Sequence, residues 1–101
     1  MPLLLKIEDF ALFPGGRDRS DGDWSGQQFR EEVLTPALSE VDEISVDLRG
    51  AKILLPSFLD EAFGPLIEDL GKKEFLRRVK IVYEKDSDVE DNVLETIRLR
   101  G

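Results

Sequence analysis

Apolar residues stand at every second position in the middle of the chain, over residues 43–48, EISVDL. This period is typical of a β-strand with one buried face. Residues 79–84 repeat the alternation, and residues 3–8 are mostly apolar, as in a strand that is covered on both faces. The pattern therefore predicts three strands. Residues 10–13 either extend the first strand or form a short fourth one.

Between these strands, apolar positions recur every three or four residues, which indicates amphipathic helices. Helices are expected over residues 26–40, 57–70 and 88–100, with residues 72–78 as a basic connector or a short helical turn. Alternating strands and helices predict a single α/β domain over residues 1–101. Its small sheet of three to four strands is expected to be mostly parallel or mixed, with helices mainly on one face.

Each long helix is preceded by a serine, with Gln, Asp or Glu three residues later, which is the spacing of a capping box. The three pairs are Ser25 with Gln28, Ser57 with Asp60, and Ser87 with Glu90. Two prolines fall inside the predicted helices. Pro36 predicts either a kink or a second helical segment capped by Thr35, and Pro65 predicts a bend.

Composition removes several classes of function. The 101 residues include no His and no Cys, and we find no catalytic motif, so we expect no enzyme activity, no metal site and no cofactor. The net charge of −8 argues against nucleic-acid binding. The apolar runs are too short for a membrane-spanning helix, and the first residues lack the pattern of a secretory signal. A cytoplasmic location is expected.

Two motifs carry a resemblance to a known family. The run SGQQFR at residues 25–30 and the run SFLDEAFG at residues 57–64 resemble the STAS-like DUF4325 family of bacterial proteins, and VDLRGA at residues 46–51 resembles the signature of STAS anti-sigma-factor antagonists. The resemblance implies a STAS-like α/β fold. It also implies a non-enzymatic regulatory module that binds a partner protein, such as a kinase or another signalling protein.

The resemblance also bears on phosphorylation. In STAS domains an aspartate and a phosphoacceptor serine open the helix, and these positions fall on Leu55 and Pro56 here. Ser57 matches the second serine of that motif and is the one that could accept phosphate.

We expect a partner to contact residues 49–56 and the start of the following helix, because α/β folds place their sites at the carboxyl ends of strands. The residues predicted for this contact are Asp47, Arg49, Leu54, Leu55, Ser57, Asp60 and Glu61. The apolar run at residues 53–55 is either an exposed patch for the partner or is buried under the helix.

Structural roles compete with binding for several of these residues. Ser57 is also an N-cap candidate, and Asp60 and Glu61 would complement the helix dipole on a solvated face. Asp47 either accepts N–H groups from the loop that follows it or meets the partner.

Two further functions remain open. The loop at residues 15–23 is either an ordinary connector or, through Arg17 and Arg19, part of a site for a small anionic ligand or nucleotide at the N-terminus of the helix 57–70. Such a site would make the protein a ligand sensor. The negative charge alone raises the third function, an inhibitor of a basic partner.

Overall fold

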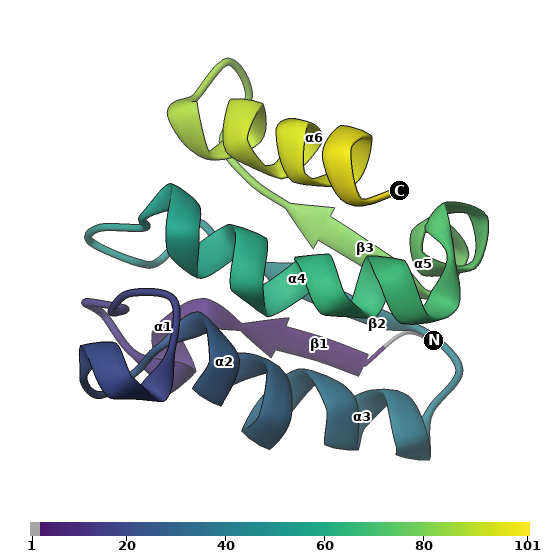
Figure 1. The fold of residues 1–101 in the computed structure, drawn as a ribbon, viewed down its shortest axis with the longest axis horizontal. Helices are drawn as coiled ribbons and strands as arrows, with labels where there is room; N and C mark the ends of the chain where they lie inside the picture. The colour runs from purple at the N-terminus through teal and green to yellow at the C-terminus, as the bar shows by residue number, and fades with distance from the viewer. Residues whose placement is uncertain (1–2) are drawn as a thin grey trace.

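The computed structural model describes residues 3–101. Within this range the sheet has three strands, β1 (Leu3–Lys6), β2 (Ile44–Asp47) and β3 (Val79–Val82), in the order β1-β2-β3. Both pairings are parallel, and Leu3, Ile44 and Val79 stand level across the sheet. The predicted α/β class is therefore confirmed, and the segments 43–48 and 79–84 do lie in one sheet (Figure 1).

The chain leaves the sheet earlier than the sequence pattern predicts. After Lys6 it forms the helical turn α1 (Ile7–Phe10), in which Ala11 donates its N–H to the Ile7 carbonyl over 2.9 Å. The first strand does not continue over residues 7 and 8, and residues 10–13 neither extend it nor form a short strand of their own, so both predictions were wrong. Because β2 ends at Asp47, residues 7–13 have no neighbouring strand, and the turn places the Ile7 side chain in the core at 0% exposure.

The predicted helix over 26–40 consists of three joined segments. α2 (Gly26–Phe29) leads into a π-helical segment, Arg30–Leu34, and then into α3 (Thr35–Glu40). The Thr35 N–H donates to the Arg30 carbonyl, five residues back, which widens the turn where the ring of Pro36 would clash with the carbonyl of Glu32. Thr35 itself has helical dihedral angles (φ −63°, ψ −46°), so it continues the helix and does not cap a new one.

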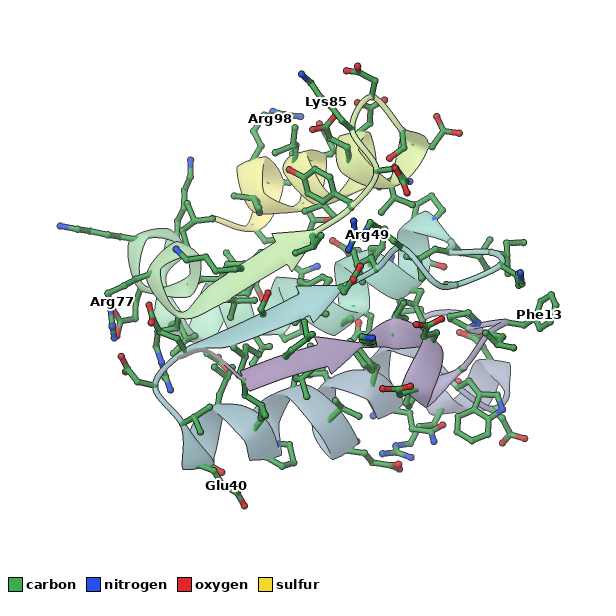
Figure 2. The ribbon with its side chains drawn as sticks, turned by 180° about the vertical axis from the view of Figure 1, so that it is seen from behind. Phe13, Glu40, Arg49, Arg77, Lys85 and Arg98 are labelled. Atoms are coloured by element: carbon green, nitrogen blue, oxygen red, sulfur yellow. The ribbon has the colours of Figure 1, made fainter. Side chains whose placement is uncertain are left out.

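The longest helix, α4 (Pro56–Leu70), crosses the middle of the sheet and continues through Pro65. α5 (Lys72–Arg78) is short, as the sequence allowed, and α6 (Asp88–Arg100) follows β3. Figure 1 shows α2, α3, α4 and α6 in front of the strands, and Figure 2 shows the opposite face of the sheet without a covering helix. No helix in residues 3–101 is both long and apolar enough to cross a membrane.

The core lies between the sheet and α4. It is closed by pairs of aromatic rings, including Phe29 with Phe58 at 5.8 Å and Phe63 with Phe75 at 6.2 Å between centroids. Gly26 lets α2 approach α4 closely, because a Cβ atom there would collide with the Phe58 carbonyl oxygen. α2 and α4 therefore pack side by side, which fixes the positions of the loops that precede them.

Candidate functional site

The turn after β2 is closed by Asp47. Its carboxylate accepts the backbone N–H of Arg49 over 3.0 Å and also the Arg49 guanidinium, with both contacts from Nε and Nη2 at 3.0 Å. This side-chain hydrogen bond, more than any other cause, lowers the pKa of Asp47. Of the two roles predicted for Asp47, acceptor of N–H groups from the following loop is the one seen. Arg49 remains half exposed at the carboxyl end of the sheet (Figure 2).

Beyond this turn, two loops lie against each other. The N–H of Lys52 donates to the Leu12 carbonyl over 2.6 Å, which joins the loop after β2 to the loop after α1. Four large apolar side chains of these loops are exposed, by 47%, 68%, 50% and 39% for Leu12, Phe13, Ile53 and Leu55 respectively. We call these four residues the loop surface. Of the apolar run at residues 53–55, only Leu54 packs against the core.

The predicted cap at Ser57 was wrong, because the helix begins one residue earlier. Pro56 is the first residue of α4, and Leu55 is the N-cap, with extended dihedral angles and no side-chain cap hydrogen bond. Proline has a fixed φ and no N–H, which suits the first helical position, and it holds the residue before it extended. Ser57 therefore lies inside the first turn, at the wall of a surface depression of about 360 Å³ that Arg17 and Asp60 also line.

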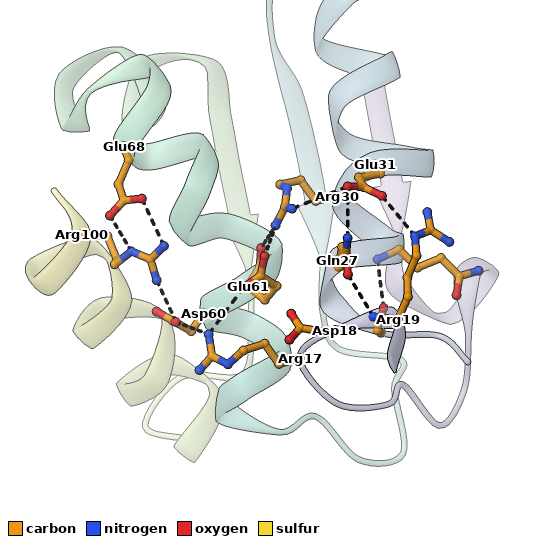
Figure 3. A network of polar contacts seen from close by, with 12 residues as sticks. Arg17, Asp18, Arg19, Gln27, Arg30, Glu31, Asp60, Glu61, Glu68 and Arg100 are labelled. Carbon is orange, nitrogen blue, oxygen red and sulfur yellow. Dashed lines mark hydrogen bonds and ion pairs between the residues drawn. The ribbon is translucent and has the colours of Figure 1, made fainter. Parts of the chain in front are cut away.

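Asp60 joins three elements of the fold and does not sit on a free solvated face. Its Oδ2 atom accepts from Arg17 Nη1 at 2.6 Å and from Arg100 Nη1 at 2.8 Å, and Asp60 is 25% exposed (Figure 3). The loop before α2 and the last turn of α6 are thereby tied to α4. Gly64 makes room for the Arg100 guanidinium, since a Cβ there would lie 2.7 Å from its Cζ atom.

Glu61 holds the guanidinium of Arg30, which sequence reasoning had not singled out. The Glu61 carboxylate accepts from Arg30 Nη1 at 2.7 Å, and both side chains are less than one-fifth exposed. The same Nη1 atom also donates to the Glu61 backbone carbonyl. That carbonyl would normally accept the N–H of residue 65, which is a proline without one. Arg30 therefore supplies the hydrogen bond that Pro65 removes from α4 (Figure 3).

The two arginines of the predicted anion site lie in different ion pairs. Arg17 reaches Asp60 beside the start of α4, whereas Arg19 contacts Glu31 and Glu32 on the π-helical segment, each at 3.1 Å. A hydrogen bond to Asp60 raises the pKa of Arg17, and one to Glu31 raises the pKa of Arg19. Their charges are thus already matched by carboxylates, and they do not converge on one point.

Together, these contacts show that the two sequence motifs form one interface between α2 and α4. Ser25 caps α2, Gly26 permits the close approach, and Arg30 binds Glu61, so SGQQFR packs on SFLDEAFG. Only two signals in the sequence point to this interface, namely the motifs themselves and the proline four residues after Glu61. Arg100 carries no such signal, because it lies far along the chain from Asp60.

The fold and this interface define a small α/β domain with a three-stranded parallel sheet and one helical layer. The chain belongs to the DUF4325 family, described as a STAS-like domain of unknown function, whose family model matches residues 25–89. Both motifs lie within the matched region. Comparisons with curated proteins and with solved structures found no match.

Proposed function

We propose that this protein is a non-catalytic module that binds a partner protein through the loop surface. The exposure of Leu12, Phe13, Ile53 and Leu55 carries this proposal. Single exposed apolar side chains are common on protein surfaces. Four large ones, contributed by two loops that are joined by a hydrogen bond, are typical of an interaction site. The loops also stand at the carboxyl end of a parallel sheet, where α/β folds place their sites.

The loop surface has the features of a binding hot spot. Phe13 is the most exposed large apolar side chain among residues 3–101, and burial of an aromatic ring is a common source of binding energy at interfaces. The Lys52 to Leu12 hydrogen bond holds the two loops together before any partner arrives, which lowers the entropy cost of binding. The proposed partner is a signalling protein, such as a kinase, and the proposed role is regulatory, in keeping with a STAS-like fold.

Asp60 and Glu61, which the sequence also placed at the interface, form ion pairs within the fold. Asp60 and Glu61 hold arginines from other elements, so we assign them to the support of the surface. The anion-sensor alternative has less support, because Arg17 and Arg19 are separated and each is paired with carboxylates. Leu55 and Arg49 remain within reach of a partner, as both are exposed.

Affinity purification from native lysate tests the proposal. We expect the double variant Phe13→Ser with Ile53→Ser to lose a protein that co-purifies with the wild type, while its circular dichroism spectrum and thermal midpoint stay unchanged. The matched control is Leu99→Ser, which removes a 64% exposed apolar side chain from α6. If the double variant retains the same co-purifying proteins in the same amounts, the loop surface is not the binding site.

A further inference from the structure

β1 forms one edge of the sheet and has backbone groups free to pair. The Leu3 N–H donates to the Glu43 carbonyl over 3.2 Å, so the peptide groups of Leu3 and Leu5 point toward β2. Peptide groups alternate in direction along a strand, so the N–H and C=O groups of Leu4 and Lys6 point away from the sheet. Within residues 3–101 no strand pairs with this side of β1 (Figure 1).

The composition of β1 does not protect this edge. Natural edge strands usually carry charged residues or proline that discourage pairing with another chain. β3, at the opposite edge, has Lys80 in its interior, whereas the lysine of β1, Lys6, is its last residue and follows three consecutive leucines. Leu3 and Leu4 are 42% and 54% exposed. An apolar edge of this kind is a favourable template for an added strand.

An apolar groove runs beside the same edge. It encloses about 350 Å³, with Leu4 and Leu5 on the strand side and Phe10, Trp24 and Val33 on the other. The Trp24 ring packs edge-on against Phe10 at 5.4 Å between centroids. The backbone N–H of Trp24 donates to Gln28 Oε1 over 2.9 Å, which holds the backbone that carries this exposed ring. The groove can therefore receive the alternate side chains of an extended segment.

Charge at the groove selects the kind of segment. Asp9 and Glu32 line it together with Lys6. Glu32 is bonded to Arg19, whereas neither Lys6 nor Asp9 has an ion pair with any described residue; Lys6 stands level with Asp47 on the neighbouring strand. Two of the three charged residues that line the groove are acidic and the chain has a net charge of −8, so the groove favours a Lys or Arg in the occupant that can reach Asp9.

We propose that β1 accepts an extended segment of a partner protein as a fourth strand, with apolar residues at alternate positions and at least one Lys or Arg. Main-chain hydrogen bonds to Leu4 and Lys6 would supply affinity, and the groove and Asp9 would supply specificity, as in other cases of strand addition. This goes beyond the proposed function by naming a second surface and a class of partner, and it does not require the loop surface to bind anything.

A display library of short random peptides, selected on the full-length protein, provides the probe. We expect enriched peptides with alternating apolar residues, a Lys or Arg and no proline. Their synthetic forms should bind Leu4→Pro at least about tenfold more weakly, because this change removes an outward N–H at an edge position that tolerates proline. Trp24→Gly and Asp9→Lys should also weaken binding. Glycine suits position 24, where φ is +62°.

Amide hydrogen exchange of the complex provides the specific readout. Bound peptide should slow exchange at Leu4 and Lys6, and Phe13→Ser should leave the affinity unchanged. The proposal is overturned if no peptide is enriched, if the peptides bind without protecting these two amides, or if Phe13→Ser abolishes their binding. A concentration-dependent dimer in sedimentation velocity that Leu4→Pro abolishes would also overturn it, because the occupant would then be a second copy of this chain.

Discussion

Ser25 is completely buried, and its Oγ atom accepts the N–H of Gln28 over 3.0 Å. We predict that Ser25→Ala lowers the free energy of unfolding by about 1–2 kcal/mol, because the change leaves a helix N–H without its acceptor. Ser57→Ala is the matched control and should change it by less than about 0.5 kcal/mol, the usual effect of a substitution outside such features. Urea denaturation of both variants measures this, and equal losses would contradict the assignment of the caps.

The serine positions show what local sequence can predict. Ser25 and Ser87 are N-caps as expected, and Oγ of each accepts the N–H three residues on. In an ordinary capping box the third helical residue accepts the backbone N–H of the cap itself. Here the side chains of Gln28 and Glu90 accept the backbone N–H of Trp24 and Asp86, one residue before the cap. Ser57 has the same spacing but is not an N-cap. The helix begins at Pro56, because the fixed φ of proline suits the first helical position. Two overlapping start signals cannot be ranked from spacing alone.

Asp47 provides a prediction about pH. The hydrogen bonds from Arg49 lower the pKa of Asp47 in the folded protein below its unfolded value of about 4. The unfolded chain therefore binds more protons, and the contribution of this pair, fully present above about pH 5, is lost as the pH falls through the folded pKa. We expect Asp47→Asn to flatten the acid side of the stability curve, and Arg49→Met to flatten it less, because the backbone N–H of residue 49 still donates to Asp47 in that variant. An unchanged slope in chemical denaturation at several pH values would contradict this.

The elements could largely be predicted, because each has a clear period. Strands at 43–48 and 79–84 and the helix at 57–70 lie within two residues of β2, β3 and α4. The π-helical segment could not be predicted in detail. Pro36 signals a disturbance, but its position alone does not show whether the turn widens, as it does here, or breaks. The end of β1 also depends on another element, because a strand stops where its neighbour stops.

The contact between α2 and α4 can be tested by a double-mutant cycle. Arg30→Met should lower the free energy of unfolding by about 1–3 kcal/mol, because it removes the hydrogen-bond donor of the part-buried Glu61 carbonyl and leaves only Arg17, 3.6 Å away, beside the Glu61 carboxylate. Pro65→Ala restores an N–H four residues after Glu61. We expect Pro65→Ala to be more favourable in the Arg30→Met variant than in the wild type, and the difference between its two effects on the free energy of unfolding should be about 1 kcal/mol. If the effects of the two substitutions simply add, Arg30 does not replace the missing helical hydrogen bond.

At the scale of the whole molecule, residues of the two sequence motifs hold its helices together. Asp60, Glu61 and Arg30 join three helices and a loop, and each pairing spans more than thirty residues of the chain. Such pairings follow from tertiary packing and cannot be predicted from spacing. A partner site at the carboxyl end of the sheet stays a prediction, although the sequence did indicate the apolar run that contains Ile53 and Leu55. The other two residues of the loop surface, Leu12 and Phe13, could not be predicted, because that segment had been interpreted as a strand.

The direct test of the loop surface as a binding site is site-specific photo-crosslinking in native lysate. A photoreactive phenylalanine analogue replaces Phe13 or Ile53, and the same analogue at Leu99 on α6 is the control, since this position is comparably exposed. We predict that both loop positions capture the same discrete protein, whereas the control position captures none. Equal capture at all three positions, or none at Phe13 and Ile53, would contradict the proposal that the loop surface binds a partner.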